Sequence, residues 1–302
     1  MKMSSITKTL ITKLEKEPHQ EGLKLDIKLL EKLLKKAIND YYNTDKPLLT
    51  DKTFDILETI LKERYPEAEL FKTIGAPITN NEDKVKLPYY LGSLDKVKPG
   101  EKVLTKWLKD NEGSILISEK LDGLSCLLVI EKSAGGSGSG GGGTLNMKLY
   151  KHGDGYEGQE ITNLLENVNI SKTKLNMKEI EKLLSIHKHI AIRGEIIIKN
   201  NVFDTKYTKL YPKARSLIAG IVNSKKPDSK IVKDIDIVFY EWIAPDTLTY
   251  ENQFNSLKKI GVLCANYKIY SSLTETQIPE LLMDFKKESL YEIDGIILSN
   301  NT

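Results

Sequence analysis

A chain of 302 residues is long enough to bury a large core and to form two domains. Its 40% of hydrophobic residues and net charge of +3 are ordinary, so charge alone does not predict nucleic-acid binding. No apolar stretch approaches the roughly 20 residues that span a membrane, and residues 1–10 lack the core of a secretory signal. Two cysteines, Cys126 and Cys264, cannot form a Cys₄ zinc site. We therefore expect an intracellular protein of the cytoplasm or a viral factory, not a secreted one.

The first 70 residues show helical periodicity. Apolar residues recur near helical spacing across residues 10–38, and a polar, aromatic bend is predicted at 41–49. Thr50 or Asp51 can cap the next helix, which Pro66 ends. We predict a small helical module over residues 1–74.

Beyond residue 75 the pattern changes. A proline-containing loop is expected to residue 100, and strands then alternate with helices without a regular βαβ period. This predicts an α+β domain with a mixed or antiparallel sheet over residues 75–302. The Gly/Ser-rich residues 134–143 have the composition of a linker and are expected to form the tip of a hairpin. The predicted strands are 114–119, 124–130, 145–151, 190–198, 235–242 and 293–298, and the predicted helices are 101–111, 177–186, 252–260 and 275–287.

The residues Lys120-Leu121-Asp122-Gly123 follow a predicted strand. A lysine that acts as a nucleophile must be neutral when it attacks. Asp122 could orient the amine or hold a metal ion, and Gly123 lets the backbone turn. Taken alone, this short pattern arises often by chance and fits an exposed hairpin turn equally well.

Three further motifs follow in order: Arg193-Gly194-Glu195, Ile237-Val238-Phe239-Tyr240 and Glu292-Ile293-Asp294-Gly295-Ile296-Ile297. Taken singly, each could be an ordinary strand, and Tyr240 a core tyrosine. Together with the lysine motif they resemble the nucleotidyltransferase superfamily of DNA ligases and capping enzymes. The resemblance implies that Lys120 carries AMP, Glu195 holds the ribose, Tyr240 stacks on adenine, and Asp294 lies near the metal and phosphates.

An N-terminal segment points to the NAD⁺-dependent branch. The run from Tyr41 to Pro47, with Asp51, Phe54 and Asp55, resembles the module that binds the nicotinamide mononucleotide (NMN) half of NAD⁺ in those ligases. Aromatic faces suit a cationic nicotinamide ring. The alternative is a plain helix–turn–helix with a capped second helix. By resemblance the ligand-binding residues here are Tyr41, Tyr42, Asp51, Phe54 and Asp55.

Three other segments resemble the same family. Residues 87–96 resemble its S-L-D segment beside the adenine pocket, which implicates Ser93 and Leu94. Residues 152–162 resemble its G-D-G-x-x-G-E-D-I-T run, whose glycines suggest close approach of the backbone to a ligand. Arg215 falls where a family arginine precedes a helix. The sequence of residues 87–96, together with the excess of lysine over arginine in the chain, resembles ligases of large DNA viruses.

The sequence also departs from the family. Ser118 stands where a glutamate is usual. The next residue, Glu119, is a candidate binding residue, but neighbours on a strand point to opposite faces. His152 and Asn223 stand where arginines are expected, and Ser299 where a lysine ends the fourth motif. No fifth motif follows. Since such cations stabilise developing phosphate charge, we expect one part of a longer enzyme that does not seal nicks alone.

These patterns predict the adenylation step of an NAD⁺-dependent DNA ligase, the first step of nick sealing in replication and repair. NAD⁺ is the expected substrate, Mg²⁺ the expected metal near Asp122, Glu195 and Asp294, and nicked double-stranded DNA the partner of the full-length enzyme. One alternative is a catalytically silent NAD⁺-binding or scaffolding module. Others are an ATP-dependent ligase or capping-type enzyme, and an α+β domain whose motifs arose by chance.

Overall fold

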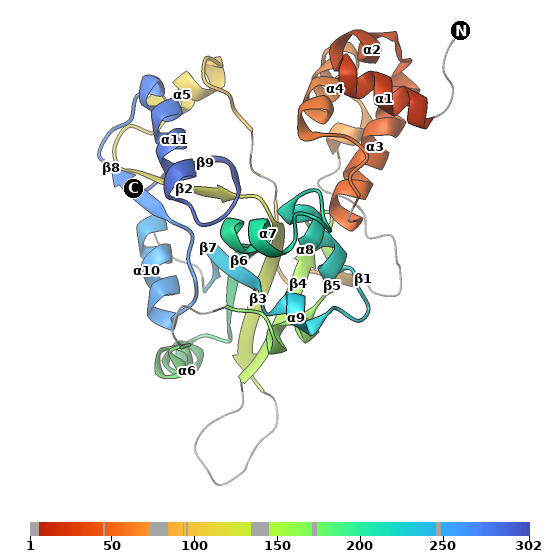
Figure 1. Cartoon of the computed structure of the whole chain (residues 1–302). Coiled ribbons are helices and arrows are strands. Elements are labelled where there is room, and N and C mark those ends of the chain that lie inside the picture. The colour runs from red at the N-terminus through yellow and green to blue at the C-terminus, as the bar shows by residue number, and fades with distance from the viewer. Residues whose placement is uncertain are drawn as a thin grey trace.

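The structure is a computed structural model that describes residues 6–44, 46–72, 84–92, 94, 96–133, 145–170, 174–245 and 249–302. Figure 1 shows a group of helices at the N-terminal end beside a larger part built around two sheets. Among the described residues, no helix is both long and apolar enough to cross a membrane. The predicted α+β class is confirmed, since helices pack with two antiparallel sheets.

The N-terminal helices form a module around a leucine-rich core. Leu10 of α1, Leu34 of α3 and Leu57 of α4 are fully buried together. Three side chains cap these helices by accepting a backbone hydrogen bond. The predicted boundary at residue 74 falls outside the described residues. The elements are α1 (Lys8–Lys16), α2 (Pro18–Lys24), α3 (Ile27–Asn43), α4 (Asp51–Arg64) and the 3₁₀ helix η1 (Glu69–Lys72).

Helix α3 is longer than its periodicity predicts. A bend was expected at 41–49, but the helix continues to Asn43, so Tyr41 lies on its last turn. Thr44 then leaves the helix, and its hydroxyl donates a 2.8 Å hydrogen bond to the Asp40 carbonyl oxygen. The end of α3 therefore lies against α8 (Ala214–Val222) of the larger part (Figure 1).

The larger sheet has six strands in the order β1-β5-β4-β3-β6-β7, and every neighbouring pair is antiparallel. Its main apolar core includes Leu128, Ile192 and Phe239, under helices such as α8 and α10 (Tyr250–Ile260). A smaller cluster, with Leu91, Leu127 and Ala191, covers the other face. The strands are β1 (Lys84–Lys86), β3 (Leu124–Lys132), β4 (Leu145–His152), β5 (Glu157–Glu160), β6 (His189–Ile198) and β7 (Ile235–Ala244).

The second sheet has three strands in the order β8-β2-β9: β8 (Tyr267–Tyr270), β2 (Ile115–Leu121) and β9 (Ile293–Asn300). The predicted strands on either side of Asp122-Gly123 are present, but they belong to different sheets. An exposed hairpin turn at this motif is therefore excluded. Gly123 is required here, because a Cβ atom would lie 2.2 Å from the Ile196 carbonyl oxygen.

Most predicted elements of the larger part are found within a few residues of their expected ends. The remaining helices are α5 (Lys102–Asp110), α6 (Met177–Ile186), α7 (Asn200–Lys206), α8 (Ala214–Val222), α9 (Ser229–Val232), α10 (Tyr250–Ile260) and α11 (Ile278–Glu288), with 3₁₀ helices η3 (Thr162–Glu166) and η4 (Glu275–Gln277). The Gly/Ser-rich residues 134–143 lie outside the described residues. The strands flanking them pair as expected for a hairpin, Lys132 opposite Leu145.

Candidate active site

Lys120 lies near the end of β2, at the junction between the sheets. Its Nζ donates to both carboxylate oxygens of Asp294 on β9, at 2.8 and 2.7 Å. In the pairing of the two strands, Lys120 is opposite Gly295 and Leu121 is opposite Ile293, which leaves Asp294 as an extra residue. Such a bulge re-aims a side chain. Both charged side chains remain accessible to solvent.

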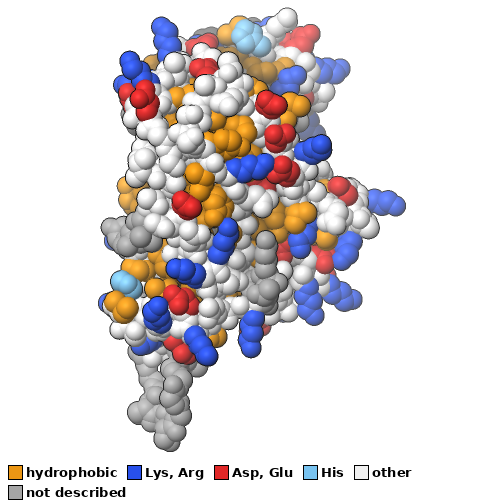
Figure 2. All heavy atoms as spheres, turned by 90° about the vertical axis from the view of Figure 1, so that its left-hand side faces the viewer, with side chains coloured by type: hydrophobic (Ala, Val, Ile, Leu, Met, Phe, Trp, Pro, Cys, Tyr) orange, Lys and Arg blue, Asp and Glu red, His pale blue; other side chains and the backbone are white. Residues whose placement is uncertain are grey.

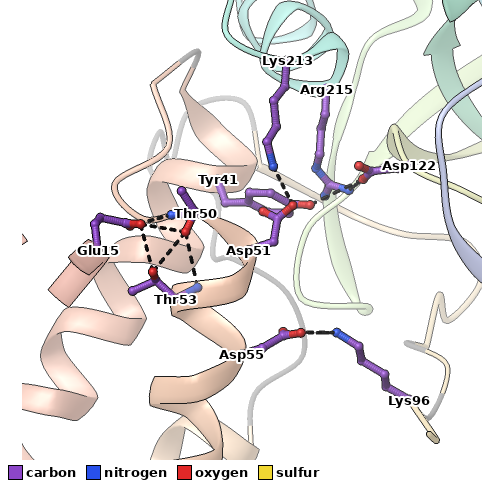
Figure 3. A network of polar contacts seen from close by, with 10 residues as sticks. All are labelled: Glu15, Tyr41, Thr50, Asp51, Thr53, Asp55, Lys96, Asp122, Lys213 and Arg215. Atoms are coloured by element: carbon purple, nitrogen blue, oxygen red, sulfur yellow. Dashed lines mark hydrogen bonds and ion pairs between the residues drawn. The ribbon is translucent and has the colours of Figure 1, made fainter. Parts of the chain in front are cut away.

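Asp122 links the lysine motif to α8 and to the helical module (Figure 3). Its Oδ1 accepts a 2.8 Å hydrogen bond from Arg215 Nη1 and a 3.4 Å one from the Tyr41 hydroxyl. The Arg215 guanidinium also lies 4.0 Å from the centre of the Tyr41 ring. Tyr41, Asp122 and Arg215 are thus brought together from three separate segments.

Two more contacts join the module to the larger part (Figure 3). Asp51 accepts a 2.6 Å hydrogen bond from Lys213 Nζ, and Asp55 pairs with Lys96 Nζ at 2.8 Å. Asp51 is fixed at the start of α4, because Thr50 caps that helix. In turn, the Thr50 backbone N–H and hydroxyl both donate to Glu15. We call the contacts of Tyr41, Asp51 and Asp55 with the larger part the module seam.

Four further residues are predicted to bind the ligand, two in the module and two in the segment 87–96. Phe54 is half-buried and packs against the leucine core of the module. The side chain of Tyr42 and all of Ser93 lie outside the described part of the chain. Leu94 is exposed. The roles predicted for these four residues therefore stay predictions.

Glu195 of β6 is buried beside the lysine motif. Its Oε1 accepts a 3.2 Å hydrogen bond from the Gly123 backbone N–H, and its Oε2 accepts one of 3.3 Å from the Tyr240 hydroxyl. Burial raises the pKa of Glu195 to about 7, although Arg215 and Arg193 oppose that shift. The carboxylate is held in one orientation by donors from two sides.

Tyr240 occupies a second bulge. Arg193 is opposite Glu241 and Gly194 is opposite Phe239, so Tyr240 is the extra residue of β7. Gly194 is needed beside it, since a Cβ atom there would lie 2.8 Å from the Val238 carbonyl oxygen. Burial raises the pKa of the Tyr240 hydroxyl far above its usual value, and the nearby Glu195 adds to this, so the hydroxyl stays protonated and can donate.

Glu119 faces away from Lys120. It is 1% exposed, and its two carboxylate oxygens accept hydrogen bonds from the Nδ2 and backbone N–H of Asn266, at 2.8 and 2.9 Å. Glu119 thus fixes the Asn266 segment, which leads into β8, against β2. Sequence reasoning did not single out Asn266, because a lone asparagine beside a strand carries no distinctive pattern.

His152 lies at the end of β4, and its Nε2 is 2.8 Å from the Leu91 carbonyl oxygen. Burial lowers the pKa of His152 to about 4, with a contribution from Arg193. At neutral pH it is therefore uncharged and does not supply the positive charge of the arginine expected there. The adjacent Lys151 is buried, and its Nζ donates a 2.5 Å hydrogen bond to Asn223 Oδ1.

The glycines after His152 do make close approaches, but to the chain itself. A Cβ atom on Gly158 would lie 2.3 Å from the Lys151 carbonyl oxygen. One on Gly155, whose φ is +96°, would lie 2.9 Å from the Tyr90 ring. These two glycines are explained by packing, without the ligand that the sequence suggested.

The three carboxylates predicted to lie near a metal have different partners. Asp122 binds Arg215, Asp294 binds Lys120, and Glu195 binds Gly123 and Tyr240. In the part of the chain that the structure describes, no group of three or more acidic, histidine or cysteine residues could hold a metal ion. These side chains alone do not fit a protein-built metal site.

Charge does not identify a nucleic-acid surface on the face that carries α10 and α11. Figure 2 shows basic and acidic side chains interspersed there. This agrees with the small net charge of the chain.

Comparisons with known proteins point to one family. A family model described as NAD-dependent DNA ligase adenylation domain matches residues 93–302. A DNA ligase of Acanthamoeba polyphaga mimivirus is 39% identical over 275 residues, which cover 90% of this chain and 39% of that protein. A putative DNA ligase of Invertebrate iridescent virus 3 is 32% identical, with 89% and 38% covered. A DNA ligase of Fusobacterium nucleatum is 28% identical, with 89% and 40% covered.

The chain thus spans about two fifths of the length of these relatives. Among solved structures, the Naegleria gruberi RNA ligase with PPi matches with a TM-score of 0.38 and 15% identity, covering 80% of this chain and 66% of that one. That likeness is too low to carry an argument. The family match covers well over half of the residues, and it includes the lysine motif and both bulged strands. The chain belongs to the NAD-dependent DNA ligase adenylation domain family.

Proposed function

We propose that this chain binds NAD⁺ and transfers its AMP half to Lys120. The observation that carries the proposal is the convergence of Lys120, Glu195 and Tyr41 around the Asp122-Gly123 junction. A nucleophile, a ribose acceptor and an aromatic ring for a cation then lie on three elements that meet there. The family match over residues 93–302 supports the same reaction.

In the proposed step, the neutral amine of Lys120 attacks the α-phosphorus of NAD⁺. A P–N bond forms, the P–O bond to the second phosphate breaks, and NMN leaves with that oxygen. The Lys120 ammonium gives up one proton before the attack, for which Asp294 is the acceptor nearest to Nζ, and the nitrogen loses a second proton to solvent once the P–N bond has formed. Close alignment of the reacting atoms supplies much of the rate advantage of such a step.

The adenosine half would lie over the large sheet. A carboxylate has about four lone-pair sites, and the two donors to Glu195 leave room for both hydroxyls of a ribose. The Tyr240 ring offers an apolar face for adenine. The NMN half would lie on the module seam, where Tyr41 already carries a planar cation, Arg215.

Mg²⁺ stays a prediction. Magnesium sites commonly use one or two carboxylates together with substrate phosphates, and a bound ion would help to neutralise phosphate charge. We assign no step to it.

We further propose that the longer enzyme passes AMP to a 5′-phosphate at a nick in double-stranded DNA, and that the 3′-hydroxyl then displaces it. This rests on the DNA ligases that match 89–90% of the chain.

A second candidate is a module that binds NAD⁺ without reacting. Two expected cations are replaced by groups that carry no charge at neutral pH: His152, whose pKa burial lowers to about 4, and Ser299, which is buried. This candidate predicts binding of NAD⁺ with no covalent product.

Intact-protein mass spectrometry after incubation with NAD⁺ and Mg²⁺ tests both candidates. We expect a mass gain of one AMP in the parent chain and none in Lys120→Ala. Lys268→Ala is the matched control, because Lys268 forms an exposed ion pair with Glu288 away from the junction. A parallel incubation with ATP tests the cofactor, and labelling by ATP alone would overturn the choice of NAD⁺. Binding without any mass gain would favour the second candidate.

A further inference from the structure

One face of the large sheet carries a continuous chain of polar contacts that ends at Glu195. Arg193 Nε donates to Ser125 Oγ at 3.1 Å. Ser125 Oγ lies 3.3 Å from the Tyr240 hydroxyl, which lies 3.3 Å from Glu195 Oε2. The four residues come from three neighbouring strands, β6, β3 and β7.

The direction of these hydrogen bonds follows from the groups at the two ends. An arginine can only donate, and at the other end Glu195 Oε2 accepts from the Tyr240 hydroxyl. The Tyr240 hydroxyl has one hydrogen, which it gives to Glu195. Ser125 must therefore donate to the Tyr240 oxygen while it accepts from Arg193. Every link then has one donor and one acceptor, and the orientation of each hydroxyl is determined.

Packing alone does not explain a serine at position 125. Strand β3 is otherwise apolar from Leu124 to Ile130, and its neighbours are buried. Ser125 is directly opposite Glu195 in the pairing of β3 with β6. An alanine would keep a small side chain, but it would break the hydrogen bonds that link Arg193 to Tyr240.

We propose that Ser125 is a positioning residue for the adenosine half of the substrate. It holds the Tyr240 hydroxyl, so that the ring stays in place for adenine while the hydroxyl fixes the Glu195 carboxylate for the ribose. Arg193 anchors the chain, since its Nη1 also lies 3.6 Å from the Glu241 carboxylate. The inference rests on the proposed function, because it assumes that Glu195 and Tyr240 hold adenosine.

Nucleotide binding to the whole chain tests the proposal. Calorimetric titrations with AMP, 2′-deoxy-AMP and NMN would compare the parent with Ser125→Ala, Ser125→Thr and Tyr240→Phe. We expect Ser125→Ala to bind AMP about three- to tenfold more weakly, the effect of one neutral hydrogen bond. It should bind 2′-deoxy-AMP almost as well as the parent does, so its preference for the ribose form shrinks. NMN binding should not change.

The hydroxyl itself is tested by rescue. Ser125→Thr keeps the hydroxyl and should restore both the affinity and the ribose preference, whereas Tyr240→Phe should lose the preference as Ser125→Ala does. Ser185→Ala is the control, because it removes a hydroxyl that bonds only within α6. Thermal melts of each variant show whether its fold is retained.

Two results would overturn the proposal. One is unchanged AMP binding in Ser125→Ala. The other is an equal loss for all three nucleotides that threonine does not restore, which would indicate a merely structural serine. If the parent binds NMN but neither AMP nor 2′-deoxy-AMP, or forms no adenylate, the proposed function itself fails. That result differs from a parent that binds AMP and a variant that behaves identically.

Discussion

Lys120 and Asp294 form a two-pronged ion pair across the small sheet, with the Lys120 ammonium 2.7 and 2.8 Å from the two carboxylate oxygens. The pair exists because a bulge in β9 turns Asp294 toward β2. A lysine held in this way has a fixed position but an engaged amine. The amine must therefore be released from this ion pair before it can attack a substrate.

Asp294→Asn should slow adenylation of Lys120 by about ten- to hundredfold, because the amine loses the carboxylate that aligns it. NAD⁺ affinity should change little. Single-turnover rates, followed by intact mass, measure the effect. Glu288→Gln, which breaks an exposed ion pair with Lys268 away from the junction, is the control. An unchanged or faster rate would show instead that the ion pair restrains the nucleophile.

The module seam should respond to salt. The pairs of Lys213 with Asp51 and of Lys96 with Asp55 are substantially exposed, so each contributes at most about 1 kcal/mol and is screened by ions. The double variant Lys96→Ala/Lys213→Ala should therefore shift the free protein toward an opened form with a larger radius of gyration. Raising the salt concentration should likewise increase the radius of gyration of the parent.

Small-angle X-ray scattering without nucleotide measures this opening. Lys268→Ala, which removes an ion pair outside the seam, should scatter as the parent does. Identical profiles for the parent and the double variant at low and high salt would mean that the two lysines do not hold the module.

The buried Lys151 should make the free energy of unfolding depend on pH in the alkaline range. Burial lowers the pKa of Lys151 from the ordinary 10.5 to about 8. Between these values the unfolded chain binds more protons than the folded one, so stability rises as the pH increases from about 8 to 10.5. The gain is roughly 3 kcal/mol at most.

Lys151→Met removes this titration and keeps a long side chain. The difference in free energy of unfolding between the parent and Lys151→Met, measured by urea denaturation from neutral to alkaline pH, should shift in favour of the parent. Parallel curves over that range would contradict the effect of burial.

Gly123→Ala should destabilise the fold by about 2–3 kcal/mol, since its Cβ would overlap the Ile196 carbonyl oxygen. Gly295→Ala is the matched control, because its Cβ would have ordinary contacts of 3.6 Å or more with Lys120. Denaturant midpoints of the two variants measure the difference. Equal stability would mean that the backbone at the junction yields easily.

Periodicity predicted the long elements of the fold and missed the short ones. The helix expected at 177–186 is found with those ends, and the strand at 190–198 begins one residue earlier, because both carry a clear apolar pattern. Strands β1, β5 and β8 have three or four residues, too few to show alternation. Periodicity did not predict helix α8, because most of its residues are apolar and buried. The family resemblance implied a helix after Arg215, and α8 begins just before it, at Ala214.

The site was predicted as a set of residues but not as an arrangement. Motif order identified Lys120, Glu195, Tyr240 and Asp294. Local pattern could not show that Tyr240 and Asp294 each occupy a bulge, because a bulge depends on the register with another strand. Ser125 could have been suspected as the one hydroxyl in an apolar strand, two residues after the lysine motif.

The chain passes from the small sheet to the large one at Asp122-Gly123, between Lys120 and Glu195. An adenylate attached to Lys120 with its ribose on Glu195 would bridge the same gap a second time. The nucleotide would then add a covalent link to the hydrogen bonds that already join the two regions, such as that of the Tyr291 hydroxyl with Asp236 of β7. The Asp122-Gly123 junction would then be more rigid in the adenylated enzyme than in the free one.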